Sequence, residues 1–195
     1  MQKIKIMKTL RINSLRVLMN LVLVAILLPA CSQNKDSNKS TNANAPEMDI
    51  HAAVLTGNLE VVKQHIKAGT NINETEPMSG STPLISAATF GKTDIVKMLI
   101  DAGADLTISN NDGTTPLHSA AFFCRVEIVQ LLIDANADKT LRNNFGATPR
   151  ETVIGPFSDI KPIYEMMQEM LGPLGIQLDM ARLEKTRPVI AMMLQ

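Results

Sequence analysis

This sequence has few cysteines, no imbalance between basic and acidic residues and no catalytic motif. Its 195 residues contain two cysteines, Cys31 and Cys124, which excludes the set of disulfides that stabilises many small secreted domains. Stability must therefore come from packing. Lysine and arginine together number 19, as do aspartate and glutamate. Because there is no basic excess, we do not expect a nucleic-acid partner.

The motifs of known active sites are missing too. The sequence has no glycine-rich phosphate loop, no nucleophile elbow and no HExxH motif. His65 has no Cys, Asp or Glu beside it at metal-site spacing, and carboxylates occur singly along the chain. We therefore expect no catalysis, no metal, no cofactor and no small-molecule substrate, which argues against an enzyme.

The first 31 residues have the pattern of an export signal. Five basic residues precede an apolar run from Val17 to Leu28, which is too short to span a bilayer comfortably and has no basic stop after it. The sequence Leu28-Pro29-Ala30-Cys31 then resembles the lipobox of bacterial lipoproteins. The resemblance implies removal of residues 1–30 and a lipid on Cys31. The alternative is an ordinary cleaved signal with Cys31 free.

The residues that follow Cys31 indicate location and a tether. Ser32 stands where, in lipoproteins, an aspartate favours retention in the inner membrane, so the resemblance implies a cell-envelope protein on the outer membrane, facing the periplasm of a Gram-negative host. Residues 31–46 have no large apolar side chain after the cysteine, which predicts a flexible tether. Loss of residues 1–30 leaves 14 basic and 19 acidic side chains, a net charge of −5.

An internal repeat dominates the rest of the chain. Thr82-Pro83-Leu84 recurs 33 residues later as Thr115-Pro116-Leu117, and 19 of the 33 aligned positions are identical. Asn110-Asn111-Asp112-Gly113 recurs as Asn143-Asn144-Phe145-Gly146. A unit of this length cannot bury its own apolar face, so the period predicts a stacked array of small helical units.

The repeated pattern resembles the ankyrin repeat. It contains Thr115-Pro116-Leu117-His118-Ser119-Ala120-Ala121, then Glu127-Ile128-Val129 and Leu131-Leu132. The resemblance implies an all-α ankyrin-repeat solenoid, in which helix-turn-helix units are joined by short β-hairpin loops. Its three repeats would cover residues 47–147, as 47–80, 81–113 and 114–146. Residues 148–195 would hold a degenerate fourth repeat and extra C-terminal helices that cap the array.

Local chemistry supports the helices independently. Thr82 and Thr115 are suited to N-caps, with proline at the first helical position. Gly69 and Gly103 stand where helices commonly end in positive φ, and Asn136 takes that place in the third unit.

Cys124 replaces the glycine found at Gly57 and Gly91, which predicts backbone strain. One interpretation makes it a reactive thiol activated by Arg125, and the other a small buried substitution.

The C-terminal tail lies outside the repeat pattern. Residues 160–171 read as the outer helix of a broken fourth unit, and residues 179–194 as one or two helices, restarting at Thr186. Their methionines are expected to seal the last repeat; the alternative is a surface that binds a partner.

The resemblance also implies roles for the histidines. His51 and His118 would hydrogen-bond the backbone of neighbouring hairpins, and His65 would lie near solvent.

The ankyrin resemblance implies that binding occurs on a concave recognition face, which is made of the hairpin tips and the ends of the inner helices. Four of the five phenylalanines fall on it, and clustered exposed aromatics are typical interface anchors. The alternative is that Phe90 and Phe123 pack on the next inner helix and Phe145 on the fourth unit. The predicted protein-binding residues are Leu55, Met78, Thr89, Phe90, Asn111, Asp112, Phe122, Phe123, Arg142, Asn144 and Phe145.

These features together predict a non-catalytic protein-interaction module. It would be held at the bacterial envelope by its N-terminal lipid and would bind an unidentified protein through the concave face. The alternative function is an accessory subunit of an envelope or exported enzyme that acts through the C-terminal helices.

Overall fold

The computed structural model describes residues 45–195. The export signal, the lipid attachment at Cys31 and nearly all of the predicted tether lie outside the described residues. No helix among the described residues has both the length and the apolar character needed to cross a bilayer.

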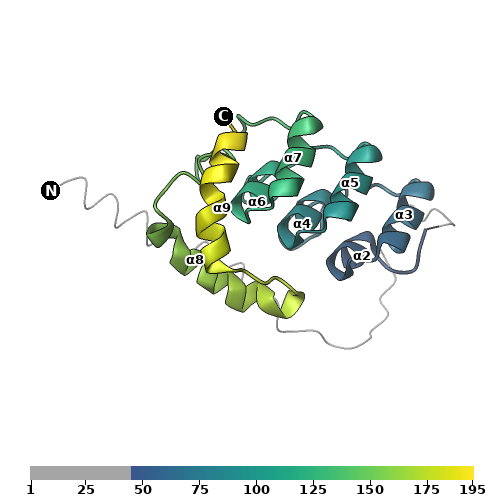
Figure 1. The fold of residues 1–195 in the computed structure, drawn as a ribbon. Helices are drawn as coiled ribbons and strands as arrows, with labels where there is room; N and C mark the ends of the chain where they lie inside the picture. Colours follow the sequence, from purple (N-terminus) through teal and green to yellow (C-terminus); the bar gives the residue numbers. More distant parts are fainter. Residues whose placement is uncertain (1–44) are drawn as a thin grey trace. The chain divides into compact units, whose positions relative to one another are not determined.

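Three antiparallel helix pairs make up the repeats. The inner helices are α2 (Ile50–Thr56), α4 (Pro83–Phe90) and α6 (Pro116–Phe122), and the outer helices are α3 (Leu59–Lys67), α5 (Thr93–Asp101) and α7 (Val126–Asp134). Each inner helix packs on the next inner helix and each outer helix on the next outer helix (Figure 1). The predicted all-α repeat stack is confirmed. Within residues 45–195 the hairpins contain no β-strand and consist of turns.

The inner helices begin where local chemistry predicts. Thr82 Oγ1 accepts a hydrogen bond from the backbone N–H of Ile85 at 3.2 Å. Thr115 forms a capping box with His118, in which each side chain bonds the backbone of the other residue. The degenerate first unit uses Asp49 instead, whose carboxylate accepts from the N–H of His51 at 2.9 Å. These caps satisfy N–H groups that a helix leaves unpaired.

Left-handed backbone conformations follow both the inner and the outer helices. Gly57 and Gly91 have φ of 74° and 67°, and Cys124 keeps the same conformation with φ of 52°. Asn136, in the place of Gly69 and Gly103, has φ of 62°. The strained conformation predicted at Cys124 is therefore present.

The histidines differ from their expected roles in two of three cases. His118 Nε2 lies 3.0 Å from the carbonyl oxygen of Ala147 in the next hairpin, as expected. The expectation for His51 is wrong, because within the described residues its buried ring nitrogens have no hydrogen-bond partner. His65 is 4% exposed rather than near solvent. Its ring nitrogens bond Thr70 Oγ1 at 3.1 Å and the carbonyl of Met48 at 2.8 Å, so it ties the degenerate first unit together.

The tail contains two helices and does not repeat the ankyrin unit. After α8 (Phe157–Leu171) and the short 3-10 helix η1 (Gly172–Leu174), α9 (Met180–Met193) runs without interruption through Pro188. The predicted restart at Thr186 is therefore wrong. It is α9, not residues 160–171, that packs on the outer helix α7 (Figure 1). Residues 149–155 form turns and bends in place of a fourth inner helix, and Pro156 disfavours helical backbone at Gly155, the last of them.

Candidate protein-interaction surface

The hairpin tips are joined into a row by hydrogen bonds between repeats. The backbone N–H of Asn111 donates to the carbonyl of Ser79 at 2.9 Å, and the side-chain amide of Asn111 donates to the carbonyl of Met78 at 3.1 Å. One repeat later, Asn144 makes the same pair of bonds to Asp112 and Asn111, both at 2.9 Å. The tips are therefore held in register with one another.

Glycines are required beneath these bonds. Gly80 and Gly113 both have φ of 70°, and a Cβ on them would lie 2.4 Å from Asn111 Oδ1 and 2.8 Å from Asn144 Oδ1, respectively. Any side chain there would push the asparagine of the next tip away, so Gly80 and Gly113 permit contact between neighbouring hairpins as well as the turn itself.

Two large apolar side chains project from the row. Met78 is 60% exposed and Phe145 is 56% exposed, and Asn111 and Asn144 are exposed beside them. Asp112 is half-buried, and burial raises the pKa of its carboxyl. The tip residues named from the sequence thus lie together. Phe145 does not pack into the fourth unit.

The ends of the first two inner helices are only partly accessible. Leu55, Thr89 and Phe90 are half-buried. The hydroxyl of Thr89 donates to the carbonyl of Ile85 at 2.9 Å, so that donor is already used within α4.

The expectation that Phe122 and Phe123 stand free on this face is wrong. Phe123 is 6% exposed. The ring of Phe122 packs against Tyr164 of α8 with centroids 4.8 Å apart, and edge-on against Phe123 at 5.1 Å. The tail helices cover the third unit, so these two aromatic side chains serve packing there.

Arg142 serves the hairpin rather than an open rim. Its guanidinium forms a two-pronged ion pair with Glu151, with Nη1–Oε2 at 2.7 Å and Nη2–Oε1 at 3.2 Å, and also bonds the carbonyl of Gly146. Glu151 in turn accepts from the N–H of Thr148 at 2.9 Å. Both side chains remain partly exposed. Arg142 therefore braces the last hairpin on the turn that follows it.

A buried arginine joins α9 to α8 and to the turn that follows the third repeat, and sequence reasoning missed it. Arg187 is 4% exposed. Its Nη1 donates to the hydroxyl of Tyr164 at 3.1 Å and to the carbonyl of Thr152 at 3.3 Å, and its Nη2 to the carbonyl of Gly155 at 3.3 Å. Burial is the main cause that raises the pKa of Tyr164 to about 12. The helical spacing of the apolar residues could have revealed it, because Leu183, Ile190 and Leu194 mark a buried face of α9 that includes Arg187.

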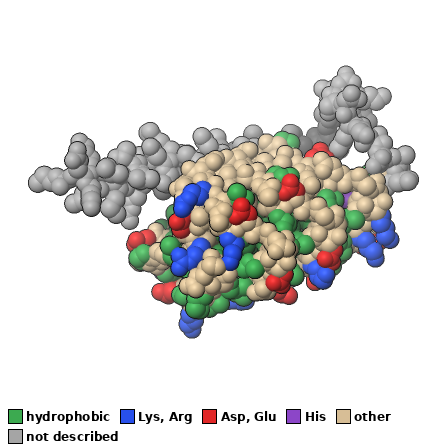
Figure 2. Space-filling model, turned by 90° about the horizontal axis from the view of Figure 1, so that it is seen from above, with side chains coloured by type: hydrophobic (Ala, Val, Ile, Leu, Met, Phe, Trp, Pro, Cys, Tyr) green, Lys and Arg blue, Asp and Glu red, His purple; other side chains and the backbone are tan. Residues whose placement is uncertain are grey.

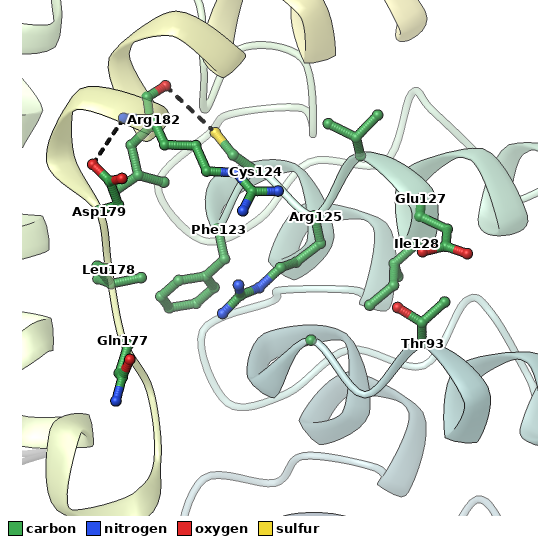
Figure 3. Close-up of a pocket in the computed structure, with 13 residues that line it drawn as sticks. Thr93, Phe123, Cys124, Arg125, Glu127, Ile128, Gln177, Leu178, Asp179 and Arg182 are labelled. Atoms are coloured by element: carbon green, nitrogen blue, oxygen red, sulfur yellow. Dashed lines mark hydrogen bonds between the residues drawn. The ribbon is translucent and has the colours of Figure 1, made fainter.

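Cys124 lies beside a pocket of about 420 Å³ between the third unit's inter-helix turn and the segment before α9 (Figure 3). Its thiol donates weakly to the carbonyl of Leu183 at 3.9 Å. Burial raises the pKa of the thiol to about 11, despite the nearby Arg187 and Arg125. The thiolate needed for a reactive cysteine is thus disfavoured, which supports the buried substitution.

Charged side chains form no large field on the face seen from above. Lys and Arg lie in small groups with Asp and Glu side chains interspersed among them (Figure 2). Among residues 45–195, no three His, Cys, Asp or Glu side chains come together as a possible metal site.

Comparison with known proteins identifies the class. Residues 50–143 match the family described as ankyrin repeats (3 copies). The repeats superimpose on the crystal structure of the ankyrin repeat domain of Bcl-3 with a TM-score of 0.52 and 30% identity, over 53% of this chain and 45% of that one. The fold is therefore an ankyrin-repeat fold, and the ankyrin resemblance of the repeats is confirmed.

The curated relatives match only part of this chain. The chain is 45% identical over 63 residues to human protein phosphatase 1 regulatory subunit 27, over 32% of this chain and 40% of the relative. It is 35% identical over 63 residues to human DNA-binding protein RFXANK, over 32% of this chain and 24% of the relative. The chain thus matches less than half the length of either protein. These similarities support a protein-interaction module.

Proposed function

We propose that this chain is a non-catalytic protein-interaction module that binds and modulates a partner protein at the bacterial cell envelope. The observation that carries the proposal is the row of hairpin tips, where Met78 and Phe145 project on a backbone braced by Asn111 and Asn144. The face comprises these tips with Asp112 and the accessible ends of the first two inner helices, which carry Leu55, Thr89 and Phe90.

The tips suit binding because they are already ordered. Ordering loops and side chains on association costs free energy, and a surface whose hydrogen bonds pre-exist avoids part of that cost. A few large side chains carry most of the energy of a typical interface. Met78 and Phe145 are such side chains, and the exposed amides of Asn111 and Asn144 between them offer polar groups for orientation.

The envelope location rests on the N-terminal sequence. The lipobox resemblance at Cys31 and the polar residues 31–46 are consistent with a lipid-anchored, tethered module. Anchoring would raise the effective concentration of the tips near the membrane. A modulating role is supported by one relative named as a regulatory subunit.

The test compares two double variants of the full chain in affinity capture from envelope membranes, with mass spectrometry of the retained proteins. Met78→Ala/Phe145→Ala removes the tip anchors. The matched control, Leu174→Ala/Met192→Ala, removes two side chains of similar exposure on the tail, 51% and 61%. A protein retained by the native chain and the control but lost from the tip variant supports the proposal. Retention of the same protein by all three forms would show that the tips are not the binding surface.

The control also tests the alternative function. Leu174, Val189 and Met192 are exposed apolar side chains of the C-terminal tail, and they would suit an accessory subunit that acts through its tail. Loss of the partner from the control variant alone would favour that function over binding by the tips.

A further inference from the structure

Two arginines from distant parts of the chain line the pocket beside Cys124. Arg125 comes from the turn between α6 and α7, and Arg182 from the first turn of α9. Figure 3 shows Arg182 reaching over from α9 toward the turn that carries Arg125. The pocket volume of about 420 Å³ is within the range of small-ligand sites.

Arg125 is held in place but poorly satisfied. Its side chain lies across Gly91, where a Cβ would be 3.1 Å from the guanidinium carbon and from Nε. Nη2 donates to the carbonyl of Thr89 at 3.3 Å. Within the described residues, the buried Nε has no acceptor. Burial, followed by the charge of Arg182, lowers the pKa of Arg125. The native fold therefore holds a partly buried cation near a like charge.

The acidic groups of the pocket do not neutralise this pair. Asp179 Oδ1 accepts the backbone N–H of Arg182 at 3.1 Å and caps α9. The side chain of Glu127 points away from both arginines in Figure 3. None of the ion pairs found in residues 45–195 involves either arginine. In that same region no side chain caps the N-terminus of α7, whose first residues line the pocket.

We propose that this pocket binds a carboxylate of the partner protein, supplied by an acidic side chain that enters between Arg125 and Arg182. A planar carboxylate matches the donor geometry of guanidinium groups. Phe123 and Leu178 form an apolar wall in the pocket, which suits the methylene stem of a glutamate. The two arginines of the pocket are matched in number by Asp179 and Glu127, so the pocket lacks the excess of positive charge that would favour a phosphate dianion over a singly charged carboxylate. This proposal deepens the proposed function, because it states the chemistry of one partner group.

The pocket can be tested without knowing the partner. The full chain, labelled with ¹⁵N, is titrated with N-acetylglutamic acid amide, sodium acetate and inorganic phosphate at constant ionic strength, while NMR follows the Nε–H signals of Arg125 and Arg182. We expect saturable shifts with both carboxylates, and tighter binding of the glutamate derivative than of acetate because its stem contacts the apolar wall. Arg182→Gln and Arg125→Gln should each weaken binding by about tenfold.

Lys97→Gln is the matched control, since Lys97 is an exposed cation in an ion pair on α5, and it should leave the affinity unchanged. Arg182 is exposed, so its variant keeps the test valid if Arg125→Gln does not fold. Shifts that do not saturate, or that persist unchanged in Arg182→Gln, would overturn the proposal. Saturation by phosphate alone would overturn the assignment to a carboxylate.

The outcome is separable from that of the proposed function. If the titration fails and the tip experiment succeeds, the carboxylate site is rejected and the tip surface stands. If the titration succeeds and the tip experiment fails, the carboxylate site stands and the tips are rejected as the binding surface.

Discussion

The hydroxyl of Tyr164 donates a 2.6 Å hydrogen bond to the carbonyl oxygen of Phe122. Phe122 ends α6, and its carbonyl has lost its intrahelical partner. Tyr164 is fully buried and is held from its other side by Arg187. One side chain from the tail therefore completes the last inner helix of the repeats, in the place where another repeat would otherwise follow.

This contact predicts that the tail contributes to the stability of the repeats. Tyr164→Phe removes the bond to Phe122 and the acceptor of Arg187 while keeping the ring. We expect unfolding to become easier by about 1–3 kcal/mol, because buried polar groups lose partners. Urea unfolding followed by circular dichroism measures the change. Ser158→Ala, at an exposed hydroxyl of the same helix, should change stability by less than about 0.5 kcal/mol; equal values for the two variants would contradict the prediction.

The left-handed backbone at Cys124 makes a second prediction. Alanine and glycine both remove the thiol, but only glycine adopts φ of 52° without a Cβ penalty. Cys124→Gly should therefore be more stable than Cys124→Ala by about 1 kcal/mol. Comparing the two variants isolates the backbone, because both lose the buried sulfur. Thermal unfolding measures the difference, and an alanine variant that equals or exceeds the glycine variant would show that the strain is absent.

Glu76 is expected to make the stability of the protein depend on pH. Partial burial opposes ionisation, but hydrogen bonds from Ser79, Met78 and Ser81 outweigh it and lower the pKa of the carboxyl from 4.5. A lowered pKa in the folded state stabilises the protein above about pH 4.5 and loses that contribution as the pH falls through the folded value. Glu76→Gln should therefore be less stable than the native chain at pH 7, with a smaller difference at pH 3. Parallel unfolding curves at both pH values check this, and a constant difference would refute it.

The lipid anchor is tested at Cys31. We expect metabolic labelling with a palmitate analogue in a bacterial host to mark the native chain and to leave Cys31→Ser unlabelled. Fractionation should move the serine variant out of the membrane. Cys124→Ser is the control, because its thiol is buried, and it should label as the native chain does. Labelling of Cys31→Ser would exclude the lipobox interpretation.

The error at Phe123 shows where sequence reasoning stopped. Phe90 and Phe123 occupy the same repeat position, yet Phe90 is half-buried and Phe123 is 6% exposed. The period assigns both to the same place in the unit. It carries no information about α8 and α9, which lie outside the repeat and cover the last unit. The pocket formed by Arg125 and Arg182 was missed for the same reason.

What the sequence determined by itself is local and periodic. Thr82 and Thr115 cap helices through bonds that span three residues. The Asn-x-Gly tips and the helix-ending glycines follow from backbone sterics within a few residues. Stacking follows from the 33-residue period, because identical units meet neighbours in identical ways.

Only the tertiary structure decided which surface stays open. The bonds from Tyr164 to Phe122 and from Arg187 to Thr152 join residues 42 and 35 positions apart, and no repeat or local propensity encodes them. They depend on how two non-repeating helices fold back on the third unit, and they bury aromatics that the repeat pattern alone would leave exposed.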